Sequence, residues 1–196
     1  MSEMSNLQDR LDQSEAKNRL NNWIAITVAI ISVFMAITKV KDDNIVQAML
    51  QAKSDAVDTW NEYQAKKIKQ HMAELGVNQV RALLVVAQGR GSSELAAQQK
   101  QYQDSIVRYQ TEETALAHKA KGFEKQYDDL NFRDDQFDLS DATLSISLAM
   151  LAIAALTGKR KLLALAWFFA GFGVLMGLAG LLGLGLHPTA LVKLLS

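Results

Sequence analysis

The stretch that decides the fold is Leu162 to Leu186, LLALAWFFAGFGVLMGLAGLLGLGL, which contains no charged residue. A helix that is apolar on every side is stable inside a membrane, and about 20 such residues cross the hydrocarbon core of a bilayer. Residues 162–186 are therefore predicted to form a membrane-spanning helix.

Two further apolar segments precede this one. Residues 23–40 begin with WIAITVAIISVFMAIT and contain one charged side chain, Lys39, which is long enough to reach the membrane surface. Residues 142–158 form a shorter run, which alone would also suit a buried helix in a soluble core. We predict three spanning helices, with the lipid bilayer as a partner.

Charge is distributed unevenly along the chain. The 196 residues include 21 basic and 21 acidic side chains, but no acidic residue occurs after Asp141. A formal net charge of zero argues against nucleic-acid binding, which needs a basic surface. The absence of cysteine from the sequence excludes disulfides and thiolate chemistry.

The basic residues 159–161 orient the predicted spans. Basic residues in short loops stay on the cytoplasmic side of a membrane. This turn and the N-terminal segment 1–22 are therefore expected in the cytoplasm, and residues 41–141 in the periplasm. Residues 187–196 form a short tail. The expected localisation is a bacterial inner membrane that the chain crosses three times.

Residues 102–144 carry mostly apolar side chains at alternating steps of four and three, as in the interface of a coiled coil. The repeat continues without a proline into the second apolar run, which predicts one helix from about Ser93 to Thr157. Separate short helices packed as a globule are the alternative. The apolar positions that we assign to the interface are Tyr102, Ile106, Tyr109, Leu116, Phe123, Tyr127, Leu130 and Phe137.

The preceding segment is also helical by pattern, with one face made of Ile45, Met49, Ala52, Ala56, Trp60 and Tyr63. Glycine and serine at 89–93 predict a turn between two arms of equal length. Equal arms favour an antiparallel hairpin whose paired residue numbers add to about 181. Gly76 offers an alternative, a helix end followed by a separate helix at the tip. The predicted fold class is all-α: an integral membrane protein with three transmembrane helices and a long antiparallel coiled-coil hairpin between the first two.

Few residues are candidates for chemistry. Asp134, Asp138 and Asp141 share one helical face just before the second span and are weak candidates for a cation-binding collar. They lack the spacing of a calcium-binding loop, and Lys39 and Lys41 are their expected ion-pair partners. The three histidines are far apart, and no nucleophile or phosphate-binding motif is present. We expect no catalytic residue, no cofactor and no metal ion.

Small residues in the third span recur at steps of four and three, which lets another helix approach closely. The stripe consists of Ala166, Ala170, Gly173, Gly177 and Gly180. Its partner is either another subunit or the second span of the same chain, through Ser145, Ala149 and Ala152.

The sequence WNEYQAKKIK at residues 60–69 follows the first span. With this stretch, the chain resembles the small bacterial membrane proteins of the family known as domain of unknown function 4337, which have the pattern W-x-x-Y-Q-A-K-x-I-K. The resemblance implies a three-span inner-membrane protein and supplies no catalytic residue or substrate. We interpret the stretch as a packing surface, with an anionic-ligand site as the alternative. The residues of this patch are Trp60, Tyr63, Gln64, Lys66, Lys67 and Lys69.

These features predict a non-enzymatic, membrane-anchored structural or scaffold protein. We expect it to form a homo-oligomer through coiled-coil packing and the small-residue stripe. One alternative is an oligomeric cation channel, with the aspartates at its mouth. Another is an accessory subunit of a larger membrane complex.

Overall fold

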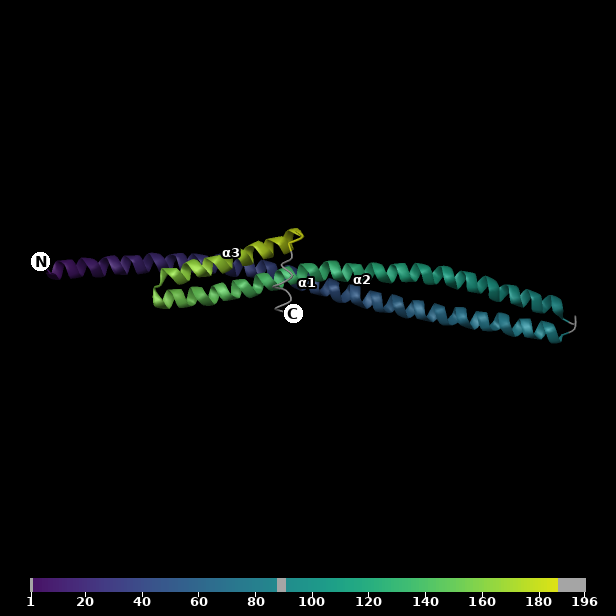
Figure 1. The fold of residues 1–196 in the computed structure, drawn as a ribbon. Coiled ribbons are helices and arrows are strands. Elements are labelled where there is room, and N and C mark those ends of the chain that lie inside the picture. The colour runs from purple at the N-terminus through teal and green to yellow at the C-terminus, as the bar shows by residue number, and fades with distance from the viewer. Residues whose placement is uncertain (1, 88–90, 187–196) are drawn as a thin grey trace. The chain divides into compact units, whose positions relative to one another are not determined.

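The computed structural model describes residues 2–87 and 91–186, and every regular element in them is a helix. The elements are α1 (Ser2–Val86), α2 (Ser92–Thr157) and α3 (Arg160–Leu182), drawn in Figure 1. The predicted all-α class is therefore confirmed. Each of the three helices contains a segment long and apolar enough to cross a membrane.

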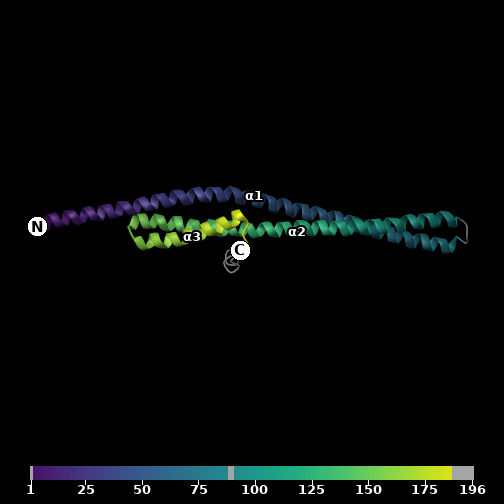
Figure 2. The same ribbon diagram turned by 90° about the horizontal axis from the view of Figure 1, so that it is seen from above.

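The chain divides into two compact units. The three-helix unit comprises Met1–Gln47 and Leu130–Ser196, and it combines parts of α1 and α2 with α3. The hairpin unit is Ala48–Asp129. Within it α1 and α2 lie side by side in both views of Figures 1 and 2 and run in opposite directions.

One face of α1 packs against α2 in the hairpin unit. Its positions recur at alternating steps of four and three, the spacing of a helix-pair interface. The half-buried Tyr63, Lys66 and Gln70 occupy the middle of this face. Thr59 takes the central position that the sequence pattern assigned to Trp60, and Trp60 is half-buried beside it. The buried members are Met49, Ala52, Ala56, Thr59, Ala73, Val77 and Val80.

The predicted face of α2 points toward α1. Its aromatic and aliphatic positions are half-buried, and Glu113 and Ala120 between them are buried. The half-buried positions in the hairpin unit are Tyr102, Ile106, Tyr109, Leu116, Phe123 and Tyr127. Leu130 and Phe137 continue the same pattern in the three-helix unit, where Phe137 is buried.

Gly76 lies inside α1, which continues to Val86, so the alternative of a separate tip helix is wrong. A Cβ at Gly76 would come within 2.8 Å of Cζ of Tyr102 on α2. The glycine therefore makes room for an aromatic ring and does not end the helix. The residue numbers of this pair add to 178, close to the predicted 181.

The turn of the hairpin falls where the glycine and serine residues predicted it. α1 ends at Val86 and α2 begins at Ser92, one residue before the predicted start. Gly91 has a φ of +69°, in the left-handed region that glycine adopts without strain. The predicted turn residues Gly89 and Arg90, the C-terminal tail and His187 lie outside the described residues.

The ends of α3 differ from the prediction. Arg160 and Lys161 belong to the first turn of the helix, so only Gly158 and Lys159 connect α2 to α3. The helix ends at Leu182, four residues before the predicted end. Gly183 stops it, because it adopts a left-handed conformation with a φ of 66° and caps the helix.

Candidate functional site

The small-residue stripe of α3 is buried inside the three-helix unit. A Cβ at Gly173 would lie 2.7 Å from Cγ of Leu144, and one at Gly177 would lie 2.7 Å from Cε1 of Phe34. The stripe therefore packs against α2 and α1 of its own chain, which is one of the two predicted alternatives. All five of its residues are buried: Ala166, Ala170, Gly173, Gly177 and Gly180.

Hydrogen bonds join α2 to α3 at three levels, seven residues apart. Two fully buried serine hydroxyls of α2 each donate to an α3 carbonyl at 2.8 Å. At the third level an arginine donates through Nε and Nη2, at 3.3 and 3.0 Å. Each accepting carbonyl belongs to the small-residue stripe, where the short side chain lets a neighbouring helix approach the backbone. The donor and acceptor pairs are Ser147 and Ala166, Ser140 and Gly173, and Arg133 and Gly180.

The face of α2 that contacts α3 is not the predicted one. Ser145, Ala149 and Ala152 are exposed, so their assignment to this interface was wrong. α2 has small residues on more than one face, and their spacing alone does not select between them. The interface includes Leu144, because its large side chain fills the space that Gly173 leaves open.

The rest of the three-helix core is aliphatic, whereas the outward faces of the helices remain exposed and apolar. Ile30 of α1, Leu156 of α2 and Phe168 of α3 are 63%, 84% and 70% exposed. An apolar exterior around a packed helical core suits a lipid environment. The buried core residues are Leu20, Ile24, Ile31, Leu144, Leu151, Ala154, Leu163, Ala166 and Ala170.

Asp42 of α1 is a buried carboxylate, only 4% exposed, that lies close to acidic residues of α2. Its Oδ2 accepts a hydrogen bond from Lys39 Nζ at 2.9 Å. Asp134 of α2 lies near Asp42, and two carboxyl groups can share a hydrogen bond only when one of them carries a proton. Among the described residues, Oδ1 of Asp42 is buried without a hydrogen-bond partner, and a protonated Asp134 is a nearby group that can donate to it.

Burial and the hydrogen bond to Asp42 raise the pKa of Asp134 to about 7, and the negative charge of Asp138 adds to the shift. Burial, followed by the charge of Asp42, likewise raises the pKa of Asp138. Asp138 and the third collar candidate, Asp141, are both exposed. In the described part of the chain no three His, Cys, Asp or Glu side chains are placed to share a metal ion.

Among the described residues, neither Lys39 nor Lys41 forms the expected ion pair with the collar aspartates, so this expectation was wrong. Lys39 pairs with Asp42 and Asp43 of its own helix, at 2.9 and 3.6 Å.

Residues of the family-like patch connect the two arms of the hairpin. Trp60 Nε1 donates to Glu124 Oε1 at 2.8 Å, and Lys66 Nζ lies 2.6 Å from Glu112 Oε2. The Lys66 contact lowers the pKa of Glu112. Gln64 and Lys69, by contrast, are exposed. The patch thus contains contacts that hold α1 to α2, as expected for a packing surface.

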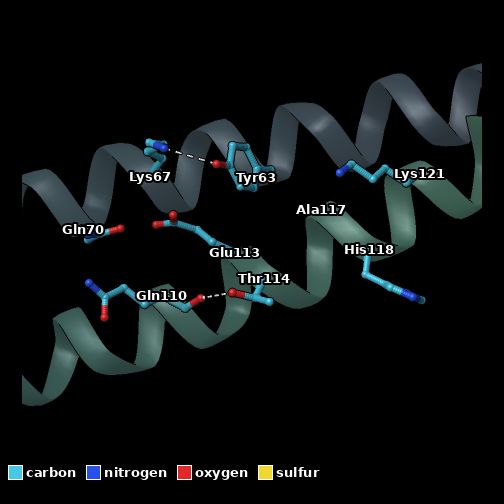
Figure 3. A pocket seen from close by; sticks show the side chains of 9 residues that line it. All are labelled: Tyr63, Lys67, Gln70, Gln110, Glu113, Thr114, Ala117, His118 and Lys121. Carbon is cyan, nitrogen blue, oxygen red and sulfur yellow. Dashed lines mark hydrogen bonds between the residues drawn. The ribbon is translucent and has the colours of Figure 1, made fainter.

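Tyr63 and Lys67, the other two residues of the patch, line an open groove of about 590 Å³ in the hairpin unit, shown in Figure 3. Lys67 Nζ donates to the hydroxyl of Tyr63 at 3.2 Å. Glu113 reaches toward them from α2, and its Oε1 is buried without a hydrogen-bond partner among the described residues. His118 lies at the same groove, but its side chain points away from α1.

The geometry defines a class of protein: an all-α chain with three apolar helices in one unit and an antiparallel helical hairpin in the other. The chain belongs to the family described as Domain of unknown function (DUF4337), whose model matches residues 20–183. The predicted resemblance is thereby confirmed. No curated protein and no solved structure matches the chain.

Proposed function

We propose that this protein is a non-enzymatic, membrane-anchored scaffold that forms homo-oligomers. The three-helix unit is its anchor in a bacterial inner membrane, and the hairpin is its soluble part. The observation that carries the proposal is the contrast between the two exteriors. The three-helix unit exposes apolar side chains around its core, whereas most of the hairpin surface is polar. Such a division suits a chain of which one part lies in lipid and the other in water.

The sequence supports one orientation of this anchor. Basic residues between the second and third spans favour the cytoplasmic side for that turn, which places the N-terminus there as well. The hairpin is then periplasmic. The hairpin fits an antiparallel coiled coil, because its inner positions follow a heptad pattern on both helices.

The contacts of the acidic residues favour a scaffold over a cation channel. A pore mouth needs carboxylates that are free to attract ions. Asp42 instead pairs with Lys39, and the pKa of Asp134 is raised to about 7, which favours its uncharged form.

The test is the native mass of the full chain in a mild detergent, measured by native mass spectrometry. A discrete oligomer in membrane extracts supports the scaffold. A monomer overturns self-association and turns attention to a different partner in a larger membrane complex. Recovery of the protein from the soluble fraction without detergent overturns the anchor.

A further inference from the structure

The outward face of α1 in the hairpin unit is uncharged along its whole length. Eleven positions at steps of three and four residues form this face, which we name the outer stripe, and all of them are exposed. Met72, Leu75 and Val86 are 65%, 68% and 77% exposed. The outer stripe consists of Leu50, Ser54, Val57, Asn61, Gln64, Ile68, Met72, Leu75, Gln79, Ala82 and Val86.

The outward face of α2 in the same unit is different. Val107 is its one exposed large apolar residue among those described, and charged side chains occupy much of the face. The charged residues include Lys100, Asp104, Lys121, Lys125 and Asp128. A charged outward face is therefore compatible with this hairpin, and the uncharged outer stripe of α1 needs another explanation. Because α2 has a charged outward face and α1 does not, we infer that the outer stripe packs against another protein surface.

We propose that the outer stripe is the surface through which two copies of this chain associate, with their α1 helices side by side and parallel. The proposal rests on the scaffold function proposed above, because anchors in one membrane hold the hairpins of both copies in the same direction and at the same height. The other two helix-packing faces, the small-residue stripe and the inner face of α2, are occupied within the chain.

The apolar area of the stripe matches what such a pair needs. Its exposed aliphatic side chains offer roughly 400 Å² of apolar surface per copy, taking about 90 Å² for each fully exposed side chain. A stable interface buries about 800 Å² per partner, of which somewhat more than half is apolar. The stripe therefore supplies most of the apolar part of an interface of ordinary size.

The polar positions of the stripe also suit a second copy. In a parallel pair at equal height, each residue meets the same residue of the other copy. Asn61, Gln64 and Gln79 have amide side chains, and an amide both donates and accepts hydrogen bonds, so each can pair with itself. Serine at Ser54 has the same property.

One pair of flanking charges is complementary in this arrangement. In parallel helices, a residue just before one interface position lies beside the residue five positions later on the other helix. Lys53 precedes Ser54, and Asp58 follows Val57. Lys53 of one copy therefore lies beside Asp58 of the second copy, and symmetry repeats this pair on the opposite side. Both side chains are exposed.

Single cysteines test the proposal cleanly, because the natural sequence contains none. We expect Leu75→Cys and Val57→Cys in the full chain, in mild detergent, to form disulfide-linked dimers under gentle oxidation. The matched control is Val107→Cys, which replaces a residue of similar exposure, 63%, on α2. Stripe cysteines should cross-link about tenfold faster than the control, since equal height brings identical positions within disulfide reach.

A second variant keeps the test independent of disulfide geometry. Leu75→Glu places a charge on an exposed position, so each chain should fold with unchanged helix content while the native mass falls to that of a monomer. Unchanged mass in this variant overturns the proposal, as does cross-linking of Val107→Cys at the rate of the stripe cysteines. An oligomeric wild type without cross-linking at the stripe overturns the inference and leaves the scaffold function standing. A monomeric wild type overturns both.

Discussion

The two units bring helices together by opposite means. In the three-helix unit the contact surfaces are small residues, aliphatic side chains and buried serine hydroxyls that donate to backbone carbonyls. In the hairpin unit the middle of the interface is polar, with a lysine–glutamate ion pair and a tryptophan–glutamate hydrogen bond at its edges.

The difference reflects the solvent that each exterior suits. Where the surroundings are as apolar as the side chains, burial of apolar surface gives no advantage, and close packing with interhelical hydrogen bonds must hold helices together. In water, a stripe of alanine, valine and aromatic residues drives pairing, and polar residues at the edges select the register. The following predictions test this contrast.

The largest expected effect is at Gly177, which has one of the two closest contacts of the three-helix unit. Gly177→Ala places a Cβ 2.7 Å from both the Phe34 ring and Ser140 Oγ. The overpacking should lower the free energy of unfolding by about 2–3 kcal/mol. An SDS titration of the protein in mild detergent, followed by circular dichroism, measures the change. Gly171→Ala is the matched control, because nothing lies within 4 Å of a Cβ there. An equal loss of unfolding free energy in Gly177→Ala and Gly171→Ala would show that the close contact at Gly177 is not the cause.

The corresponding contact in the hairpin should tolerate substitution better. Gly76→Ala brings a Cβ to 2.8 Å from the Tyr102 ring, which is only half-buried and can move aside. We expect a loss of about 1 kcal/mol in hairpin stability, because the gain in helix propensity offsets part of the clash. Hydrogen exchange of the hairpin amides measures it. Gly122→Ala, which meets no neighbour, should instead increase protection.

The raised pKa of Asp134 makes the three-helix unit sensitive to pH. The folded state keeps the Asp134 proton up to a pH of about 7, whereas the unfolded chain releases it near 3.8, the ordinary aspartate pKa. The folded state then binds more protons, so stability falls as pH rises between these values. Solvent screening limits the change to about 1 kcal/mol. Thermal unfolding at pH 5 and pH 8 measures it.

An asparagine in place of Asp134 carries an amide that can donate a hydrogen bond to Asp42 at any pH. Asp134→Asn should therefore be as stable at pH 8 as at pH 5, whereas the exposed Asp141→Asn should keep the pH dependence of the wild type. A pH dependence that survives in Asp134→Asn would assign it to another group, with Asp138 the first to examine because its pKa is also raised.

The smallest effect is expected at the edge of the hairpin. Trp60→Phe removes the donor to Glu124 and should cost about 0.5 kcal/mol, because the lost hydrogen bond is partly replaced by water. Hydrogen exchange in α1 near Trp60 is the measurement. Glu124→Gln keeps an acceptor and should change little. A loss in Trp60→Phe as large as that of Gly177→Ala would remove the contrast between the two units.

The helices could be predicted from the sequence because their signals are local. An uninterrupted apolar run, a heptad repeat without proline and a Gly-Ser turn each act within one segment. Gly76 shows the limit of that reasoning, because its sequence context suits a helix end and only the ring of Tyr102 explains it. The end of α3 was missed because any of three nearby glycines could stop a helix.

By itself, the sequence determined the number of helices, the antiparallel arms, the family and the inner face of α2 in the hairpin. Only the tertiary structure decided which face of α2 meets α3, which partner the small-residue stripe takes, and which carboxyl groups lie near one another. The physical reason is that periodicity specifies how side chains are arranged around one helix. Which of several similar faces becomes buried depends on shapes and donors from distant segments, such as Leu144 against Gly173 and Asp42 against Asp134.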